Sequence, residues 1–364
     1  MRRGEVNTTN GSATLFNEAY HAAYDYVSDY TAFSLLRALR TAGVPIRGGF
    51  SEEEAVQRLG CLPQYRPHVR WVLAFLVQQQ ALTVLAQGNY MEVRPEAWYR
   101  PAQAAGLNLN IEPSMRLIDY VISWWPAIVQ GKADPLHVMF GSQGSSLWER
   151  YFNNGHDLYA VHNQWAAESL ADEMPDGRKA KVLEVGVGYG SAARALLAEC
   201  QLRSQEIDTY LLSDVSPLLA GKAKGMLAAD YPRVAIQSRK IDINRIQGVS
   251  ACSFDFIYAV NVIHCAESVR DTLAMLRELL SEGGCLVVSE CVRADYASRL
   301  HQEFVFSLLP GFGNVQPSPE APPCFGFRTA EEWRQLMQAA GFRKAQAEVN
   351  AGAQVRGVMI KGWV

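Results

Sequence analysis

The sequence predicts an α/β protein whose C-terminal part contains a parallel β-sheet and whose N-terminal part is mostly α-helical. From Lys181 onward, short apolar runs alternate with helical patterns, as they do in proteins built around a parallel sheet. A glycine-rich stretch lies between the first of these runs and the helical pattern that follows it. Before residue 100, three helical patterns precede two short strand-like segments.

The C-terminal part is predicted to form a seven-stranded sheet. The predicted strands lie at 182–185, 209–213, 234–239, 254–260 and 285–290, with a final antiparallel pair at 345–349 and 355–360. The predicted helices lie at 191–200, 217–229, 267–280 and 329–340.

The N-terminal part has the element order of a winged helix. Helices are predicted at 15–42, 51–60 and 66–79, followed by strands at 82–86 and 90–93. A DNA reader needs a basic footprint, but the third helix offers only Arg66, His68 and Arg70. We therefore interpret this part as a scaffold. Its apolar side chains exceed what a small module needs to bury, so we expect a homodimer formed through residues 15–95.

Composition excludes several classes of protein. The chain has 364 residues and a net charge of −3, so nothing attracts it generally to nucleic acid or to an anionic membrane. No apolar run is long enough to span a bilayer, and no signal peptide is recognisable. The seven cysteines form no CxxC pair, and the histidines do not cluster. We expect a cytoplasmic protein without a bound metal.

Four regions are predicted. Residues 1–13 are predicted to be a disordered tail, and residues 14–100 are predicted to form the winged-helix dimerisation domain. Residues 101–170 are predicted to be a helical linker that lines a pocket for a small-molecule acceptor, and residues 171–364 are predicted to form the sheet domain. Aromatic side chains supply rigid apolar walls for small molecules. The candidate wall residues are Trp124, Trp148, Phe304, Phe306 and Phe312, with His162 as a further candidate that could equally lie on a helix surface.

The stretch from Glu184 to Gly190 has the pattern of a ligand-binding loop. Glycines at 186, 188 and 190 follow an apolar strand and precede a helix. Glycine lets a ligand approach the backbone, and a helix N-terminus offers free N–H groups. The spacing of two residues, with Glu184 placed two before the first glycine, differs from the GxGxxG loop of dinucleotide enzymes. We assign these four residues to a cofactor site.

Two further acids follow the second and third predicted strands. Asp214 can accept hydrogen bonds from ribose hydroxyls, as acids at this position do in nucleotide-binding folds, or it can cap the next helix. Asp242 can accept from an adenine amino group, or it can cap a turn.

These segments resemble a known family. The glycine loop, the Asp214 segment and residues 254–264 and 280–284 look like successive motifs of class I S-adenosylmethionine methyltransferases. The likeness is closest to the methyltransferase domains of polyketide synthases, through 261–264, 131–136 and 308–312. The layout also resembles small-molecule O-methyltransferases with an N-terminal winged helix. The resemblance covers about 15–362. It implies a Rossmann-like domain that binds S-adenosylmethionine through Gly186, Gly188, Asp214 and the backbone around Asn261.

His264 and Glu290 are the candidate catalytic pair. His264 follows the fourth predicted strand, and Glu290 ends the fifth. If these strands are neighbours, both side chains emerge at the edge where the glycine loop lies. Histidine can take a proton near neutral pH, and a carboxylate can orient its ring. The alternative is a polar residue at a strand end and an unrelated surface acid.

The pair does not tell oxygen methylation from carbon methylation. The O-methyltransferase relatives have Asp-Trp where this chain has Cys265-Ala266, and an acid where it has Phe327. The separate winged-helix domain nevertheless favours an O-methyltransferase that acts on a small-molecule or carrier-bound acceptor. Two alternatives stay open. One is methylation of a carbon next to a carbonyl, and the other is a DNA-binding regulator with a vestigial cofactor domain.

Overall fold

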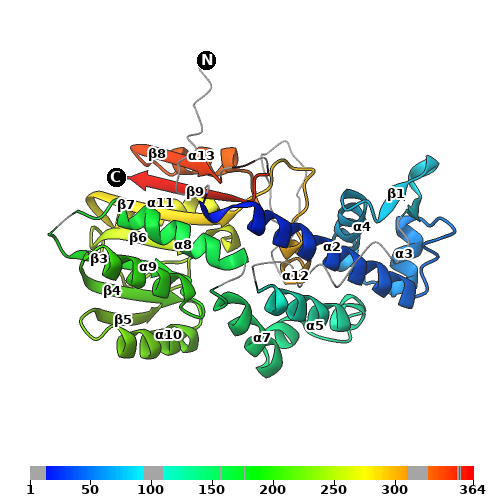
Figure 1. Cartoon of the computed structure of the whole chain (residues 1–364), viewed down its shortest axis with the longest axis horizontal. Coiled ribbons are helices and arrows are strands. Elements are labelled where there is room, and N and C mark those ends of the chain that lie inside the picture. The colour runs from blue at the N-terminus through cyan, green and yellow to red at the C-terminus, as the bar shows by residue number, and fades with distance from the viewer. Residues whose placement is uncertain are drawn as a thin grey trace, which may run out of the picture. The chain divides into compact units, whose positions relative to one another are not determined.

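A computed structural model of the chain describes residues 14–93, 110–155, 158–175, 177–309, 327–350, 352 and 354–364. The chain divides into two compact units (Figure 1). The sheet unit comprises Met1–Asn17, Tyr159–Ala294 and Arg328–Val364, and the helical unit comprises Glu18–Leu158 and Asp295–Phe327. Both units are therefore discontinuous in sequence, and their boundaries differ from the predicted divisions at 100 and 170.

The described part of the sheet unit holds a seven-stranded sheet in the order β5-β4-β3-β6-β7-β9-β8. All neighbouring pairs are parallel except β7–β9 and β8–β9, which are antiparallel. The strands are β3 (Ala180–Val185), β4 (Ile207–Asp214), β5 (Ala235–Lys240), β6 (Phe254–Val260), β7 (Leu280–Cys291), β8 (Lys344–Val349) and β9 (Gly357–Trp363). The predicted seven-stranded, mostly parallel sheet is confirmed.

Helices pack on both faces of this sheet (Figure 1). They are α8 (Leu158–Ala171), α9 (Ser191–Leu202), α10 (Pro217–Asp230), α11 (Val269–Leu279) and α13 (Ala330–Ala339). One apolar core joins α11 and α13 to side chains such as Leu286 and Val288 of β7. Successive strand residues point to opposite faces. Ser289 follows Val288, so its side chain points to the opposite face of the sheet, where it contacts His162 of α8.

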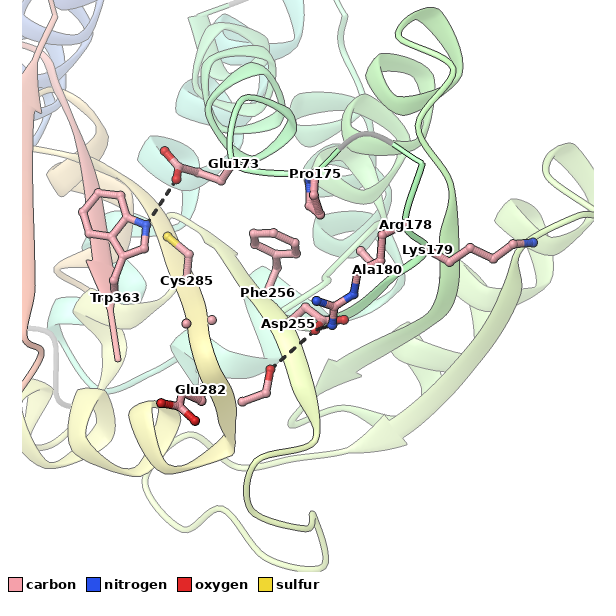
Figure 2. A pocket seen from close by; sticks show the side chains of 13 residues that line it. Glu173, Pro175, Arg178, Lys179, Ala180, Asp255, Phe256, Glu282, Cys285 and Trp363 are labelled. Carbon is pink, nitrogen blue, oxygen red and sulfur yellow. Dashed lines mark hydrogen bonds and ion pairs between the residues drawn. The ribbon is translucent and has the colours of Figure 1, made fainter.

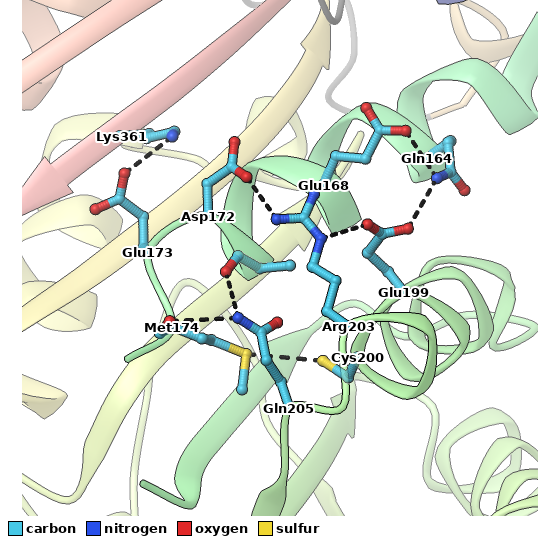
Figure 3. Close-up of polar contacts among 11 residues, drawn as sticks. Gln164, Glu168, Asp172, Glu173, Met174, Glu199, Cys200, Arg203, Gln205 and Lys361 are labelled. Carbon is cyan, nitrogen blue, oxygen red and sulfur yellow. Dashed lines mark hydrogen bonds and ion pairs between the residues drawn. The ribbon is translucent and has the colours of Figure 1, made fainter. Parts of the chain in front are cut away.

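A polar network fastens α8 to α9. Arg203, at the end of α9, lies 2.6 Å from Asp172 and 2.6 Å from Glu199 (Figure 3). Gln164 of α8 donates to the second oxygen of Glu199 at 3.3 Å. Because Glu199 is buried, its carboxylate needs these partners, and the network fixes the helix whose N-terminus adjoins the glycine loop.

The helical unit contains the elements predicted for the N-terminal part. Its helices are α2 (Glu18–Thr41), α3 (Glu52–Leu59), α4 (Arg66–Gln78), α5 (Glu112–Val129), α6 (Pro135–Phe140), α7 (Ser142–Phe152) and α12 (Gln302–Phe306). Strands β1 (Leu82–Val84) and β2 (Tyr90–Glu92) form an antiparallel pair. The order of elements is thus present, but it does not by itself establish a winged helix, and that identity is not confirmed.

A buried carboxylate links residues 295–309 to α4 of the helical unit. Glu303 of α12 is fully buried, and it accepts a hydrogen bond from the indole N–H of Trp71 at 2.7 Å. His68 of α4 contacts the Ser307 hydroxyl at 2.7 Å. These long-range polar contacts join α4 to a segment more than two hundred residues later, which hydrophobic periodicity cannot predict.

Two findings bear on the predicted role of the N-terminal region. Arg66 and Arg70 each make two hydrogen bonds to a carboxylate of α3, so most of the basic character of α4 is neutralised. The apolar side chains on which the expected homodimer was based, Leu35 and Val72 among them, are buried within the chain itself. Homodimerisation through residues 15–95 stays a prediction, to be checked by light scattering.

Candidate functional site

The three glycines of the loop between β3 and α9 serve different purposes. All have positive φ, at 68°, 50° and 81° for Gly186, Gly188 and Gly190. A Cβ on Gly186 would lie 2.4 Å from Val262, and one on Gly190 would lie 3.3 Å from Ala223 of α10. At Gly188 the nearest atom would be 3.9 Å away. The outer glycines therefore allow close packing, whereas the middle one leaves open space that a ligand can enter.

Asp214 connects this loop to the end of β4. One carboxylate oxygen accepts the N–H of Gly188 at 3.0 Å, and the other accepts the N–H of Ser216 at 2.8 Å. The residue that caps α10 is Ser216, whose hydroxyl accepts the N–H of Leu219. Each Asp214 oxygen keeps a second lone pair for a hydroxyl donor. The position thus fits a ribose-binding role better than that of a helix cap.

Glu184 is buried, whereas Asp242 is exposed. Glu184 is buried and accepts a hydrogen bond from the Tyr210 hydroxyl of β4. Burial raises its pKa to about 8, against the lowering effect of that hydrogen bond. Asp242 is exposed, and one oxygen accepts the N–H of Asn244 at 2.9 Å. Asp242 therefore caps a turn through one oxygen, and its role toward an adenine amino group stays a prediction, whereas Glu184 supports the strand beneath the loop.

His264 and Glu290 lie in direct contact at the carboxyl ends of β6 and β7. The distance from His264 Nδ1 to Glu290 Oε2 is 2.6 Å. The other oxygen, Oε1, accepts backbone N–H groups from Val262, Ile263 and His264 at 3.1, 2.8 and 3.3 Å. The Glu290 side chain is fully buried and that of His264 is 5% exposed. One carboxylate thus holds both the turn that carries the imidazole and the imidazole itself.

The charges around His264 affect its pKa and determine which ring nitrogen carries the proton in the neutral form. Burial by itself would lower the pKa of His264, but the neighbouring Cys265 and Glu290 raise it, and the net pKa lies well above the ordinary value. An ionised carboxylate can only accept hydrogen bonds. Nδ1 must therefore carry a proton, and in the neutral ring the lone pair is on Nε2, which is the atom that can act as a base.

Asn261 holds the end of β6 against β7. Its backbone φ is +52°, in the left-handed region that asparagine tolerates better than most residues. Its side-chain oxygen accepts the N–H of Cys291 at 2.7 Å. Tyr159 of α8, which sequence analysis did not select, donates to the carbonyl of Val260 at 3.4 Å. Nearby Glu290 is among the charges that raise the pKa of Tyr159, after burial and Cys291.

His162 lies in the interior of the sheet unit and not on a helix surface or in an open pocket. It is 2% exposed, with Nδ1 3.1 Å from the Ser289 hydroxyl and Nε2 3.5 Å from the Cys291 sulfur. Burial lowers its pKa to about 4, so the ring is neutral at physiological pH. Its predicted role as a wall of the acceptor pocket does not fit these contacts.

The predicted aromatic wall residues separate into groups. Trp148 and Phe306 line a small recess in the helical unit. Phe304 is fully buried among other aromatic rings, and Trp124 is 41% exposed on α5. Phe312 lies outside the described residues. The reading of all five as walls of one pocket is therefore not supported.

A larger cavity of about 190 Å³ lies in the sheet unit, at the amino ends of the parallel strands and so opposite the edge that carries the glycine loop (Figure 2). Its lining includes Arg178, Asp255, Gly284 and Trp363, from the amino ends of β3 and β6 and the end of β9. Parallel sheets bind ligands at the carboxyl ends of their strands. This cavity contains neither the glycine loop nor the His264–Glu290 pair, so we do not assign it to the reaction.

In the described ranges, no helix combines the length and hydropathy needed to cross a bilayer. Within the same ranges, no group of three or more His, Cys, Asp and Glu side chains is arranged to hold a metal ion.

Sequence comparison connects the chain with methyltransferases. A family model described as a methyltransferase domain matches residues 183–286. Compactin diketide synthase mlcB of Penicillium citrinum is 28% identical over 252 residues, which are 68% of this chain and 9% of that protein. Reducing polyketide synthase Preu2 of Preussia isomera is 27% identical over 286 residues, which are 77% of this chain and 12% of that protein. The chain thus spans about a tenth of the length of these relatives.

Solved structures share the fold over almost the whole chain. The DszA carbon methyltransferase has a TM-score of 0.76 and 20% identity, with 98% of this chain and 94% of that chain covered. The CMeT domain of the citrinin polyketide synthase has a TM-score of 0.73 and 17% identity, with 99% of both chains covered. The mitomycin 7-O-methyltransferase MmcR has a TM-score of 0.50 and 13% identity, with 92% and 94% covered.

The sheet order, the loop and the methyltransferase-domain match over residues 183–286 are those of a class I S-adenosylmethionine-dependent methyltransferase domain, which implies S-adenosylmethionine as the cofactor. The open side of Gly188 and the lone pairs of Asp214 fit this cofactor. Within the class, the chain resembles the C-methyltransferase domains of polyketide synthases. The sequence-based preference for O-methylation is not supported, because it depended on a winged-helix domain whose identity is not confirmed.

Proposed function

We propose that the protein methylates a carbon atom next to a carbonyl group in a polyketide-type or keto-acid acceptor. The observation that carries the proposal is the shared fold over nearly the whole chain. TM-scores of 0.76 and 0.73 connect it to carbon methyltransferases, against 0.50 for an O-methyltransferase. The proposal covers a free acceptor and an acceptor bound to a carrier protein.

The His264–Glu290 pair suits this reaction because a carbon acid needs a base before it can become a nucleophile. Nε2 of His264 takes the proton, the C–H bond breaks, and its electron pair moves into an enolate of the acceptor. The nearby Glu290 carboxylate stabilises the imidazolium that forms. Bound S-adenosylmethionine supplies an electrophilic methyl group. The enolate carbon would take this methyl group, forming the new C–C bond as the S–CH₃ bond breaks and leaves S-adenosylhomocysteine, and the proton leaves the imidazolium for solvent.

The methylated atom can be identified directly. The enzyme is incubated with cofactor carrying a ¹³C-methyl group and with acetoacetyl-N-acetylcysteamine, a small thioester with an acidic carbon. We expect the label on the carbon between the two carbonyls, seen by NMR as a C–CH₃ signal. An O–CH₃ signal would contradict the proposal in favour of O-methylation. A phenolic acceptor serves as the comparison substrate and should stay unlabelled.

A further inference from the structure

The edge of the sheet that β5 forms carries an excess of positive charge. Helix α10 packs beside this strand (Figure 1). Residues 215–248, which contain both elements, include six lysines and arginines and two acids, although the whole chain has a net charge of −3. A local excess of one sign creates a potential that the net charge of a chain does not reveal.

The cations at this edge have no internal counter-charge. Among the described residues none of the six forms an ion pair, and Arg239 donates to a backbone carbonyl. Of the two acids, Asp230 is engaged by Arg194 of α9 at 2.8 Å, and Asp242 accepts the N–H of Asn244. The remaining cations are exposed and accessible to another molecule: Lys222, Lys224, Arg233, Lys240 and Arg245.

The outward side of α10 combines one of these cations with exposed apolar side chains. The helix buries its other side against the sheet through Ala220, Ala223 and Leu227. Leu218, Lys222 and Met226 recur every four residues away from that buried side, so they form one row along the helix. Leu218 is 70% exposed and Met226 is 38% exposed. We call this row the α10 face.

The order of side chains along the α10 face limits the kind of molecule that it fits. A helix that enters a membrane interface has an uninterrupted apolar side, but here Lys222 separates Leu218 from Met226. Proteins that bind single-stranded nucleic acid stack bases on aromatic rings, and residues 215–248 include one aromatic residue, Tyr231. A protein helix that places a carboxylate between two apolar side chains matches both the charge and the spacing.

We propose that the α10 face is the docking site for an acidic amphipathic helix of a partner protein. The partner's apolar side chains pack on Leu218 and Met226, and its carboxylates lie near Lys222 and the surrounding cations. Such pairing mainly accelerates association and selects the partner, because each exposed ion pair adds little affinity. The inference is independent of the proposed function, since it uses neither the glycine loop nor the His264–Glu290 pair.

A synthetic stapled helical peptide tests the inference on the full chain. One side of the peptide carries a leucine–glutamate–leucine row with the spacing of the α10 face, and a matched peptide carries glutamine in place of glutamate. In fluorescence anisotropy, we expect the glutamate peptide to bind about tenfold more tightly than the glutamine peptide. Its affinity should fall as the salt concentration rises, because salt screens exposed charges.

Variants of the protein locate the contact. Lys222→Glu/Arg233→Glu should weaken binding of the glutamate peptide about tenfold, because attraction becomes repulsion at two cations. Lys132→Glu/Lys179→Glu makes the same change in net charge at exposed residues outside the α10 face, and it should bind like the wild type. Leu218→Ser removes an apolar contact and should weaken binding of both peptides equally. Unchanged thermal unfolding serves as the control for folding in each variant.

Three results would overturn the inference: equal affinity for the two peptides, equal effects of the two double variants, or no binding of the glutamate peptide. Tighter binding of phosphatidylserine vesicles or of a single-stranded RNA than of the glutamate peptide would assign the cations to a membrane or to nucleic acid instead. A photoreactive group in the glutamate peptide should attach within α10, and attachment only at other elements would also contradict the proposed site.

Discussion

Glu290→Gln should inactivate the enzyme at least as completely as His264→Ala, although it changes only one atom of the side chain. Glu290 Oε1 accepts three backbone N–H groups, and Oε2 accepts from His264 Nδ1. A glutamine must keep its oxygen toward the three donors, so its NH₂ group faces the imidazole and donates to Nδ1. The neutral ring then carries its proton on Nε2, and the atom that should act as the base has no lone pair.

The expected loss of rate in Glu290→Gln follows from this change in the tautomer of His264. A comparable exchange of a carboxylate for an amide beside a catalytic histidine costs about 10⁴-fold in rate. Removal of the base itself in His264→Ala should cost roughly 10²–10⁴-fold. A glutamine whose oxygen faced the ring could still accept from it, and the amide would then cost less than the alanine. The three backbone donors remove that possibility.

Exchange of the acidic protons of acetoacetyl-N-acetylcysteamine in D₂O measures the base without any methyl transfer. The wild-type rate, corrected for the uncatalysed reaction, should rise with pH and level off only well above pH 6.5, because the raised pKa of His264 keeps the ring protonated at lower pH. In Glu290→Gln, loss of the carboxylate charge should lower that pKa while the rate stays low. A Glu290→Gln variant within threefold of the wild-type rate would refute the tautomer argument.

Three further changes have defined outcomes. Gly188→Val should abolish S-adenosylmethionine binding in calorimetry, whereas Gly283→Val, in the irregular part of β7 with φ of +75° and open space, should leave it intact. Binding by the first variant would remove the loop from the cofactor site. Asp214→Ala should weaken cofactor binding by roughly 1–3 kcal/mol, and unchanged affinity would exclude the ribose role. Glu184 has a pKa of about 8 when folded against 4.5 ordinarily, so the unfolded chain releases this proton first. Stability should therefore fall as pH rises from about 4.5 to 8, by at most about 1.4 kcal/mol per pH unit. Glu184→Gln should flatten that slope in urea unfolding, and an unchanged slope would place the titration elsewhere.

Much of the sheet unit could be predicted because its signals are local. Strand 254–260 and the starts of α9 and α10 match the structure, since apolar runs, the glycine loop and Pro217 mark them. Strand β7 begins at Leu280, five residues before the predicted start. The register shifts there, and residues 281–284 leave the ladder, so Gly283 and Gly284 resembled a turn between two elements.

The candidate site was only partly accessible to sequence analysis. The contact between His264 and Glu290 could be predicted, because neighbouring parallel strands end at one edge. The burial of Glu184 and His162 could not, since each depends on partners from other elements, Tyr210 and Ser289. The extent of the helical unit depends on contacts such as that of Trp71 with Glu303, which link distant segments.

The three backbone hydrogen bonds to Glu290 make the two members of the pair unequal in what their loss does to the molecule. Replacing His264 removes a reactive ring but leaves every one of these bonds in place. Replacing Glu290 with an apolar residue leaves the N–H groups of 262–264 without their acceptor and unfastens the turn between β6 and α11. In homologues that are no longer selected for activity, the histidine should therefore be replaced before the glutamate. A sequence that keeps only the glutamate should fold but lack activity.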